Sequence, residues 1–561
     1  QVEGAETMVA EVFSAMIQGI EGQIVKIQVD ISNGLPNFNM IGYLSNEVKE
    51  SKERVRTALN NIGVLLPPKR ISVNFAPADF RKCGTSFDIG VAAAILLAMD
   101  FVPETYIKDT LFVGELSLNG QICPISGVLP IVVAASKRGI KRCIVAQENV
   151  AEAAFVEQME GIGCRNLEEL FFYLKHGYII NDDSGEILEN SGNISEDSGK
   201  ECTIQDVKKS QEISESTRSL NLKSTVLVKD ILENADEDKI SVTDFSEVKG
   251  QVMAKRAMEI AAAGYHNLML GGPPGVGKSM LASCISGIMP QMTTEEMIDT
   301  TIIYSAKGLL KDSFSLITKR PFRNPSLAVT QAGMFGGGMT PQPGEISLAH
   351  HGILFLDEFP EYKREIIEML RVPLEKHEIS IVRKEQTLTF PADFLLSVCA
   401  NSCPCGYYPM DKCRCTYRQI VKYQNRISGP ILDRIDLFVR CEEIGYEALT
   451  SNSKEESSAD IRKRVSKAWE IQKERFAQST TLFNGRMNKN EVEIYCKLDR
   501  EGQQLMKEAF SVFQLTGRSY FKILKVARTI ADLEGSYDIK SRHVEEALYF
   551  RQKGEGRVKV R

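Results

Sequence analysis

The segment LMLGGPPGVGKSM, residues 268–280, combines small and polar residues in a spacing that predicts phosphate binding. Gly272, Gly277, Lys278 and Ser279 fit G-x-x-x-x-G-K-[ST], after an apolar run and before a helix-like one. Small residues let backbone N–H groups turn around phosphate oxygens, and a helix N-terminus adds positive potential. A chance glycine–proline turn is the alternative, but strand, loop and helix agree. The predicted ATP-binding residues are Gly272, Pro273, Pro274, Gly275, Val276, Gly277, Lys278 and Ser279.

Two acidic residues follow a second apolar run and would complete such a site. The segment GILFLDEF, residues 352–359, has a strand-like core followed by Asp357 and Glu358. In a parallel sheet, the carboxyl ends of strands face the ligand crevice. We expect Asp357 to hold Mg²⁺ together with Ser279, and Glu358 to polarise the attacking water. Alone, such a strand end is more often a solvated loop, but the phosphate-binding pattern favours the functional interpretation.

Three further polar residues are candidates for the same chemistry. Asn401 ends the strand-like run FLLSVCAN and is placed to orient the attacking water; a simple strand-terminal turn is the alternative. Arg434, in PILDRIDL, is an arginine-finger candidate that would reach a neighbouring subunit's γ-phosphate. Its alternative is a pair with Asp433 or Asp436. Arg528, in a helix-like segment, is a nucleotide-sensor candidate, with a solvated helix face as the alternative.

Four cysteines crowd into NSCPCGYYPMDKCRCT, residues 401–416, as two Cys-x-Cys pairs. Four thiolates can surround one zinc ion at Zn–S distances of about 2.3 Å and leave no open position, so the ion would be structural. Packed thiols and a redox pair are the alternatives, and a reducing compartment disfavours the second. We predict a zinc knuckle held by Cys403, Cys405, Cys413 and Cys415.

Basic and aromatic residues near these cysteines are candidates for contact with nucleic acid, as in other zinc knuckles. They are Tyr407, Tyr408, Lys412, Arg414, Tyr417 and Arg418. Clusters of lysine and arginine elsewhere can also bind phosphates, although each alone is more often a solvated surface. These clusters lie at residues 51–56, 67–70, 81–82, 137–142 and 551–561.

Length and composition limit the class of protein. A chain of 561 residues is too long for one hydrophobic core and predicts about three or four domains. The net charge of −6 means that affinity for nucleic acid must come from local patches. The longest apolar run, residues 91–99, is too short to span a membrane, and thirteen scattered cysteines do not suggest a disulfide scaffold. We expect a cytoplasmic protein with no membrane partner.

Alternating strand-like and helix-like stretches indicate a multidomain α/β protein. They run to about residue 175 and again over 244–441, whereas residues 459–550 are charged and helix-periodic. Residues 181–217 hold ten acidic against three basic residues and no aromatic, which predicts a linker. The predicted parts are a first domain at 8–175, an acidic linker at 176–240, a P-loop core at 241–443 carrying the knuckle 401–416, a helical region at 444–552 and a basic tail at 553–561.

Several long motifs together resemble a known family. DFSEVKGQ, PGEISLAHHGILFLDEFPEY, LRVPLE, PILDRIDL and LKVARTIADLEG are similar to AAA+ ATPases of the magnesium-chelatase-subunit-I type, most closely the ComM/YifB family. The resemblance covers nearly the whole chain. It implies a central AAA+ P-loop module with a C-terminal helical lid, and ATP and Mg²⁺ as cofactors. Residues 334–350, rich in glycine, stand where the family has a hairpin insert that resembles a pore element.

The resemblance also implies a function. We expect a ring, as a hexamer, that binds single-stranded and branched DNA and drives branch migration as a helicase in the recombination that accompanies natural transformation. Two alternatives stay open: a chelatase-like ATPase that remodels a protein partner, and an ATP-dependent protease. Stimulation of ATP turnover by DNA separates the first two.

Two N-terminal segments resemble the serine and lysine segments of Lon-type proteases, which implies an S5-like α+β domain. They are RKCGTSFDIGVAAAIL and GELSLNGQICPISGVLPIVVAASKRGI. By that match Ser86 stands at the nucleophile position, but Leu129 and Ile131 stand where the lysine base would be. Because a serine nucleophile needs a base, we expect an inactive protease-like domain in which Ser86 caps the following helix. The protease alternative is correspondingly weak.

Overall fold

The chain forms two compact units, Gln1–Asp236 with Thr301–Leu316 and Glu237–Thr300 with Ile317–Arg561. The structure, a computed structural model, describes residues 9–156, 159–177, 221–223, 243–310, 316–338, 340–383, 386–446 and 455–552. The acidic segment at 181–217 and the basic tail at 553–561 therefore lie outside the described residues. Within those ranges, no helix is long and apolar enough to cross a membrane.

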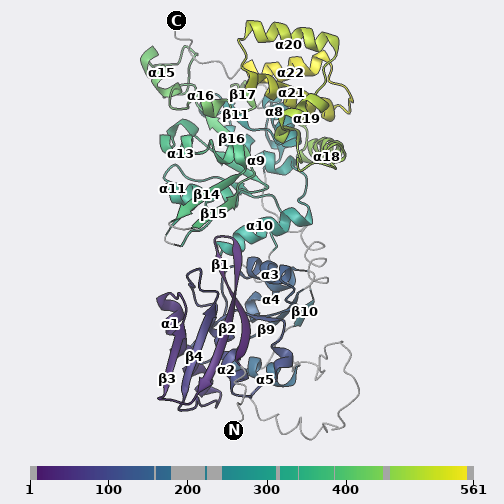
Figure 1. Cartoon of the computed structure of the whole chain (residues 1–561). Coiled ribbons are helices and arrows are strands. Elements are labelled where there is room, and N and C mark those ends of the chain that lie inside the picture. Colours follow the sequence, from purple (N-terminus) through teal and green to yellow (C-terminus); the bar gives the residue numbers. More distant parts are fainter. Residues whose placement is uncertain are drawn as a thin grey trace. The chain divides into compact units, whose positions relative to one another are not determined.

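A mixed sheet is the framework of the first unit. Its eight described strands lie in the order β10-β9-β8-β5-β1-β2-β4-β3 (Figure 1). Pairing is antiparallel between β1 and β2 and between β2 and β4, but parallel from β1 through β5 and β8 to β9. The strands are β1 (Ala10–Gln18), β2 (Glu21–Ser32), β3 (Asn37–Ile41), β4 (Arg70–Ala76), β5 (Thr110–Phe112), β8 (Arg142–Ala146), β9 (Glu160–Cys164) and β10 (Asn221–Lys223), with a separate pair β6 (Glu115–Leu116) and β7 (Ile122–Cys123).

Helices cover both faces of this sheet because its central strands are apolar on both sides. Along β1, Val12 and Met16 join one hydrophobic cluster, whereas Ala15 joins another. Successive side chains of a strand point to opposite faces, so each face requires its own cover. α2 packs in the first cluster and α3 in the second. The helices are α1 (Asn46–Asn61), α2 (Asp88–Ala98), α3 (Val128–Lys137), α4 (Val150–Ala154) and α5 (Leu167–His176).

Ser86 does not cap the helix that follows it, which corrects the sequence expectation. The N-cap of α2 is Phe87, and no side chain caps that end. The Ser86 hydroxyl instead donates a 2.7 Å hydrogen bond to the carbonyl oxygen of Ala15 on β1 and is buried. Its proton is therefore engaged by a backbone carbonyl rather than by a base, and Ser86 ties the start of α2 to the sheet.

The second unit contains a parallel sheet of five described strands in the order β12-β13-β16-β11-β17 (Figure 1). Strands β13 and β16 are buried at every position, which explains why they are continuous apolar runs rather than alternating ones. This sheet confirms the predicted α/β class. The strands are β11 (Leu268–Gly271), β12 (Phe322–Arg323), β13 (Ile353–Leu356), β16 (Leu395–Ala400) and β17 (Leu437–Arg440).

One hydrophobic cluster joins this sheet to the C-terminal helices. It includes Leu268 of β11, Ile260 of α8 and Ile530 of α21. The predicted core and helical lid therefore belong to one compact unit. The core helices are α8 (Val252–Gly264), α9 (Lys278–Ile288), α11 (Gln331–Phe335), α12 (Glu345–Leu348), α13 (Arg364–Met369), α14 (Pro373–Lys376), α15 (Tyr417–Gln424) and α16 (Gly429–Leu432); the C-terminal helices are α18 (Ser458–Arg475), α19 (Lys489–Tyr495), α20 (Arg500–Val512), α21 (Gly517–Leu533) and α22 (Ser541–Gln552). A further helix, α10 (Thr294–Ala306), begins in this unit, and its residues from Thr301 onward belong to the first unit.

A short antiparallel bridge lies within residues 334–350, where a hairpin was expected, and a longer hairpin lies later in the chain. In that segment α11 and α12 flank a single antiparallel bridge between Gly337 and Gln342. The longer hairpin is formed by β14 (Glu378–Arg383) and β15 (Gln386–Pro391), directly before β16. It projects a strand pair from the same unit (Figure 1), with Val382 75% exposed.

Candidate nucleotide site and four-cysteine loop

The phosphate-binding loop connects β11 to α9 and requires glycine at two points. Gly277 is the N-cap of α9 with a φ of 80°, a conformation that strains other residues. A Cβ on Gly272 would lie 2.6 Å from the carbonyl oxygen of Cys441, just after β17. Val276 anchors the loop in the hydrophobic core. The two glycines therefore allow the loop to turn tightly between β17 and α9.

A cavity of about 380 Å³ lies over this loop. Its other walls follow β13 and β16, because the carboxyl ends of parallel strands share one edge of the sheet. The predicted Lys278, Ser279, Asp357, Glu358 and Asn401 meet there. Pro274, Gly275 and Gly277 also line the cavity, together with Met280, Cys399 and Ala400, which sequence reasoning missed. Cys399 precedes Asn401 by two residues, a spacing that signals one strand face.

Lys278 is held at the base of the cavity. Its Nζ donates to the carbonyl oxygens of Gly272 at 2.9 Å and Pro273 at 2.8 Å, and to Asn401 Oδ1 at 3.0 Å. Because an ammonium has three donors, these contacts use all of them. Burial lowers the pKa of Lys278. The lysine therefore links the phosphate loop to the end of β16.

Ser279 and Asp357 form the oxygen pair expected for a Mg²⁺ site. The Ser279 hydroxyl donates to Asp357 Oδ2 at 2.5 Å, and Asp357 Oδ1 accepts from the backbone N–H of Glu358 at 2.8 Å. A hydroxyl and a carboxylate at the edge of a phosphate site are oxygen ligands that Mg²⁺ prefers. These two residues fit that ion, with remaining positions left to phosphate and water.

Glu358 is presented to the cavity by an unusual backbone. Its φ is 48° and ψ 41°, in the left-handed region, and its side chain is exposed. For a residue other than glycine this conformation costs about 1–2 kcal/mol, a strain typical of functional sites. After this turn, Glu358 lies in the lining of the cavity beside Asp357.

Arg434 does not line the cavity. Its guanidinium pairs with Glu375 and donates to the carbonyl oxygens of Arg371 at 3.2 Å and Pro430 at 2.8 Å. The alternative of a pair with its neighbouring aspartates is wrong, since Asp436 binds Lys522 instead. Arg434 is thus anchored at the end of α14, and its side chain is 16% exposed.

Arg528 lies inside the group of C-terminal helices and is 3% exposed, so the alternative of a solvated helix face is wrong. It pairs with Asp532 one turn later on α21 and donates to the carbonyl oxygens of Ser536 and Tyr537. These bonds fix the end of α21. Arg528 does not line the nucleotide cavity.

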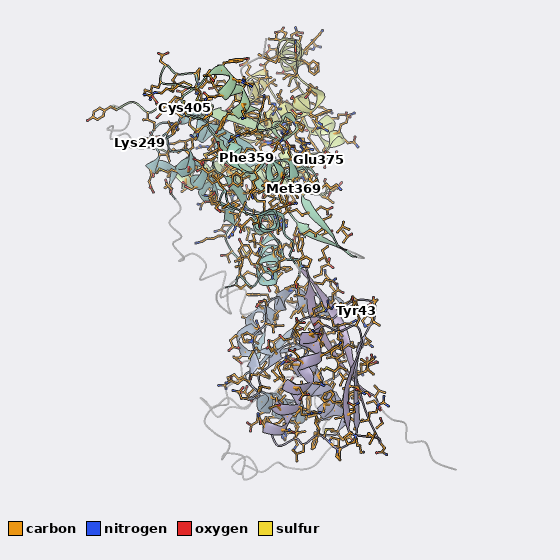
Figure 2. The ribbon with its side chains drawn as sticks, turned by 90° about the vertical axis from the view of Figure 1, so that its left-hand side faces the viewer. Tyr43, Lys249, Phe359, Met369, Glu375 and Cys405 are labelled. Atoms are coloured by element: carbon orange, nitrogen blue, oxygen red, sulfur yellow. The ribbon has the colours of Figure 1, made fainter. Side chains whose placement is uncertain are left out.

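The four cysteines of residues 401–416 converge as predicted. Their sulfur atoms all lie within 4.8 Å of one another (Cys405 is labelled in Figure 2). Cys403 Sγ is 3.4 Å from Cys405 Sγ and 3.8 Å from Cys413 Sγ, and the latter two are 3.7 Å apart. A tetrahedral zinc with Zn–S bonds of about 2.3 Å needs sulfur–sulfur separations of about 3.8 Å. All four are free thiols, so the set fits a zinc ion.

Backbone N–H groups support negative charge on two of these sulfurs, those of Cys403 and Cys405. The N–H of Tyr408 donates to Cys403 Sγ at 3.4 Å. Backbone hydrogen bonds from Tyr407 and Arg414 lower the pKa of Cys405 to about 6. Thiolates are the form that binds zinc. The loop therefore favours the thiolate of Cys405, whereas desolvation and the neighbouring cysteines raise the pKa values of Cys413 and Cys415.

A second group, Asp299, His350 and His351, is also close enough to hold an ion. However, His350 Nδ1 accepts a 3.1 Å hydrogen bond from the backbone N–H of Asp393. Burial lowers the pKa of His350 to about 4, so the neutral ring carries its proton on Nε2. That nitrogen then has no lone pair for a metal, and this group does not fit one.

Three protein-family models match successive parts of the chain. Residues 244–449 match the family described as "Magnesium chelatase, subunit ChlI", residues 27–149 "Subunit ChlI of Mg-chelatase", and residues 455–551 "Magnesium chelatase, subunit ChlI C-terminal". The chain is 37% identical to the "Competence protein ComM" of Haemophilus influenzae, over 97% of both chains. It is 35% identical to the uncharacterized protein YifB of Escherichia coli, over 95% of both. A partial match, 31% identical over 177 residues, relates 28% of the chain to 31% of Lon protease 2 of Bacillus subtilis.

Proposed function

Because the chain belongs to the ComM/YifB family of magnesium-chelatase-like AAA+ ATPases, we propose that it is a ring motor that binds branched DNA and drives branch migration in homologous recombination. Its strongest support is the similarity to a competence protein over 97% of both chains. Competence concerns the uptake of DNA, which must then be recombined. The nucleotide cavity provides the energy-converting site that such work requires.

The residues around the cavity have separable roles in hydrolysis. Lys278, now bound to loop carbonyls, would exchange them for the β- and γ-phosphates. Ser279 and Asp357 would hold Mg²⁺, which neutralises charge on the phosphates. Glu358 would accept a proton from the attacking water, and Asn401 would orient that water. The chain thus contributes the base and the orienting amide from the ends of two neighbouring strands.

We assign a structural zinc ion to Cys403, Cys405, Cys413 and Cys415. The sulfur separations support this assignment. The ion would order a loop that has turns but no helix or strand over residues 401–416. The loop and the start of α15 also carry four exposed basic or aromatic residues, Lys412, Arg414, Tyr417 and Arg418, which keeps this region a candidate for contact with DNA.

The proposal predicts that DNA structure controls ATP turnover. Turnover should rise severalfold with forks and four-way junctions, beyond its value with duplex, single strand or no DNA, because a branch-migration motor holds branched DNA most productively. The five conditions are compared at one moderate salt concentration, since phosphate contacts weaken steeply with salt. Lys278→Ala provides the blank.

Equal turnover in all five conditions would contradict the DNA proposal while leaving the ATPase in place. It would favour the second candidate, a chelatase-like ATPase acting on a protein partner. That candidate rests on the three chelatase family matches along the chain.

We further propose that Arg434 acts across a subunit interface of the ring. Arg434→Ala and Glu358→Gln should each be inactive alone, yet an equal mixture should regain activity. In the mixture, about one interface in four joins an intact Glu358 to a neighbour's intact Arg434. ATP turnover of the mixture relative to the two separate variants is the measurement. A mixture no more active than its parts would exclude action in trans.

A further inference from the structure

The four-cysteine loop packs directly against the phosphate-binding loop. Gly406, the residue after Cys405, has a φ of 86°. A Cβ on Gly406 would lie 2.5 Å from Cδ and 3.2 Å from Cγ of Pro274. Contacts under 3.0 Å force a neighbour to move, and a proline ring held in a loop has little freedom to do so. The backbone of Gly406 therefore rests on the proline ring of the loop that binds phosphate.

The cysteines determine where Gly406 lies. Its backbone N–H donates to the carbonyl oxygen of Cys403 at 2.9 Å, which closes a tight turn between the first two cysteines. Gly406 is thus part of a turn that carries two sulfur ligands. Bringing Cys413 and Cys415 to the same ion would fix this turn against the rest of the loop, because a metal restrains all its ligands together.

The start of the loop is also tied to the nucleotide cavity, and both of its ends are tied to α15. At its start, Asn401 accepts from Lys278 Nζ, and the carbonyl oxygen of Ser402 accepts from Gln424 of α15. At its end, Thr416 caps α15 through a reciprocal capping box with Gln419. A change in the cysteine cluster thus has two routes to the cavity: the contact with Pro274 and the attachment of Asn401.

We infer that the four-cysteine loop is a positioning element for the phosphate-binding loop, with Gly406 as its point of contact. Bound metal and bound nucleotide then stabilise one another. The inference rests on the zinc assignment proposed above. Since coupling between two binding sites is reciprocal at equilibrium, loss of the metal weakens ATP binding and bound ATP strengthens metal binding by the same factor. Differences in affinity lie mostly in the dissociation rate, so ATP slows loss of the metal.

The first test measures release of zinc rather than activity. Purified full-length protein is mixed with an excess of a chromogenic chelator, with and without a saturating nonhydrolysable ATP analogue and Mg²⁺. We expect the analogue to slow zinc release about fivefold, as for a typical coupling. Lys278→Ala, which loses phosphate binding, should release zinc at one rate in both conditions.

The outcomes distinguish a failure of this inference from a failure of the zinc assignment on which it rests. Zinc that leaves the wild-type protein at the same rate with and without bound analogue overturns the inference and leaves the zinc site intact. A protein that contains no zinc and takes none up overturns both. Direct titration of the analogue establishes that nucleotide was bound during the comparison.

The second test uses Gly406→Ala, whose Cβ would collide with Pro274. We expect the Kd for the ATP analogue to rise about fivefold, with kcat at saturating ATP changed less than twofold and zinc retained. Gly63→Ala is the matched control, since Gly63 has a φ of 80° and nothing within 4 Å of its Cβ position. It carries the same backbone strain without the contact and should bind the analogue normally.

Pro274→Ala removes the two ring atoms that Gly406→Ala would strike. The double variant should therefore bind the analogue like Pro274→Ala alone, and additive effects would overturn the contact as the route of coupling. If Gly406→Ala does not fold, Pro274→Ala alone tests whether the contact between Gly406 and Pro274 couples the metal to the nucleotide. Its zinc release should respond clearly less to the analogue, because only the attachment of Asn401 remains, and an undiminished response would overturn the inference.

Discussion

Glu358→Gln should lower ATP turnover by about 10²- to 10⁴-fold, the usual contribution of a general base, while leaving ATP binding intact. Glutamine keeps the size of the side chain but cannot accept a proton from water. The left-handed turn at Glu358 and the 2.8 Å hydrogen bond from its N–H to Asp357 do not depend on the carboxylate. The cavity should therefore keep its shape. Turnover at saturating ATP and the Kd of ATP, measured separately, test this expectation.

Glu361→Gln is the matched control for this variant. Glu361 is three residues away, but its carboxylate pairs with Arg426 at 2.5 Å and does not line the cavity. An exposed pair of this kind contributes about 1 kcal/mol or less, so turnover should be nearly unchanged. If Glu358→Gln keeps more than about a tenth of wild-type turnover, Glu358 is not the base. Loss of ATP binding would instead indicate a collapsed site.

The nucleotide cavity was predictable from the sequence because each of its parts is a local pattern. The phosphate loop, the pair Asp357 and Glu358, and Asn401 all follow strand-like runs. Parallel pairing of β11, β13 and β16 then brings the three strand ends together without further information. The sequence alone did not indicate the left-handed backbone of Glu358, because several residue types can occupy such a turn at a functional site.

The ion-pair partners of Arg434 and Arg528 differ in how far the sequence could predict them. Arg434 is bound by Glu375, 59 residues earlier in the chain, a pairing that no local pattern predicts. Arg528 is different, because its partner Asp532 is four residues later on the same helix. Spacing of this kind commonly forms a pair on a helix. The sequence therefore already contained a signal for the ion pair of Arg528 with Asp532.

The hairpin of β14 and β15 could also be predicted in part from the sequence. In residues 378–391, EISIVRKEQTLTFP, apolar and polar side chains largely alternate before and after the charged residues 383–385, as in half-buried strands. The contact between Gly406 and Pro274 lies beyond such patterns. It joins two loops more than a hundred residues apart, and only the packing of the folded sheet brings them together.

The second large effect is expected at the cysteine cluster. Cys403→Ser should lower bound zinc from about one ion per chain to nearly none, because three thiolates hold the ion far less tightly than four. Cys403 is fully buried and lies 3.4 Å and 3.8 Å from two of its partners. We expect the melting temperature to fall by about 5 °C or more, since each kcal/mol corresponds to about 2–4 °C in a domain of this size. Elemental analysis and thermal unfolding are the measurements.

Cys123→Ser is the matched control, since this partly exposed thiol lies on β7 in the other compact unit. It should keep its zinc and its melting temperature. Chelation of the wild-type protein should reproduce the change seen in Cys403→Ser but produce no further change in that variant, because the same ion is removed in both cases. A wild-type protein with four reduced thiols and no zinc would show that packed thiols alone order this loop. Equal melting temperatures for the zinc-bound and zinc-free proteins would show that the ion does not stabilise it.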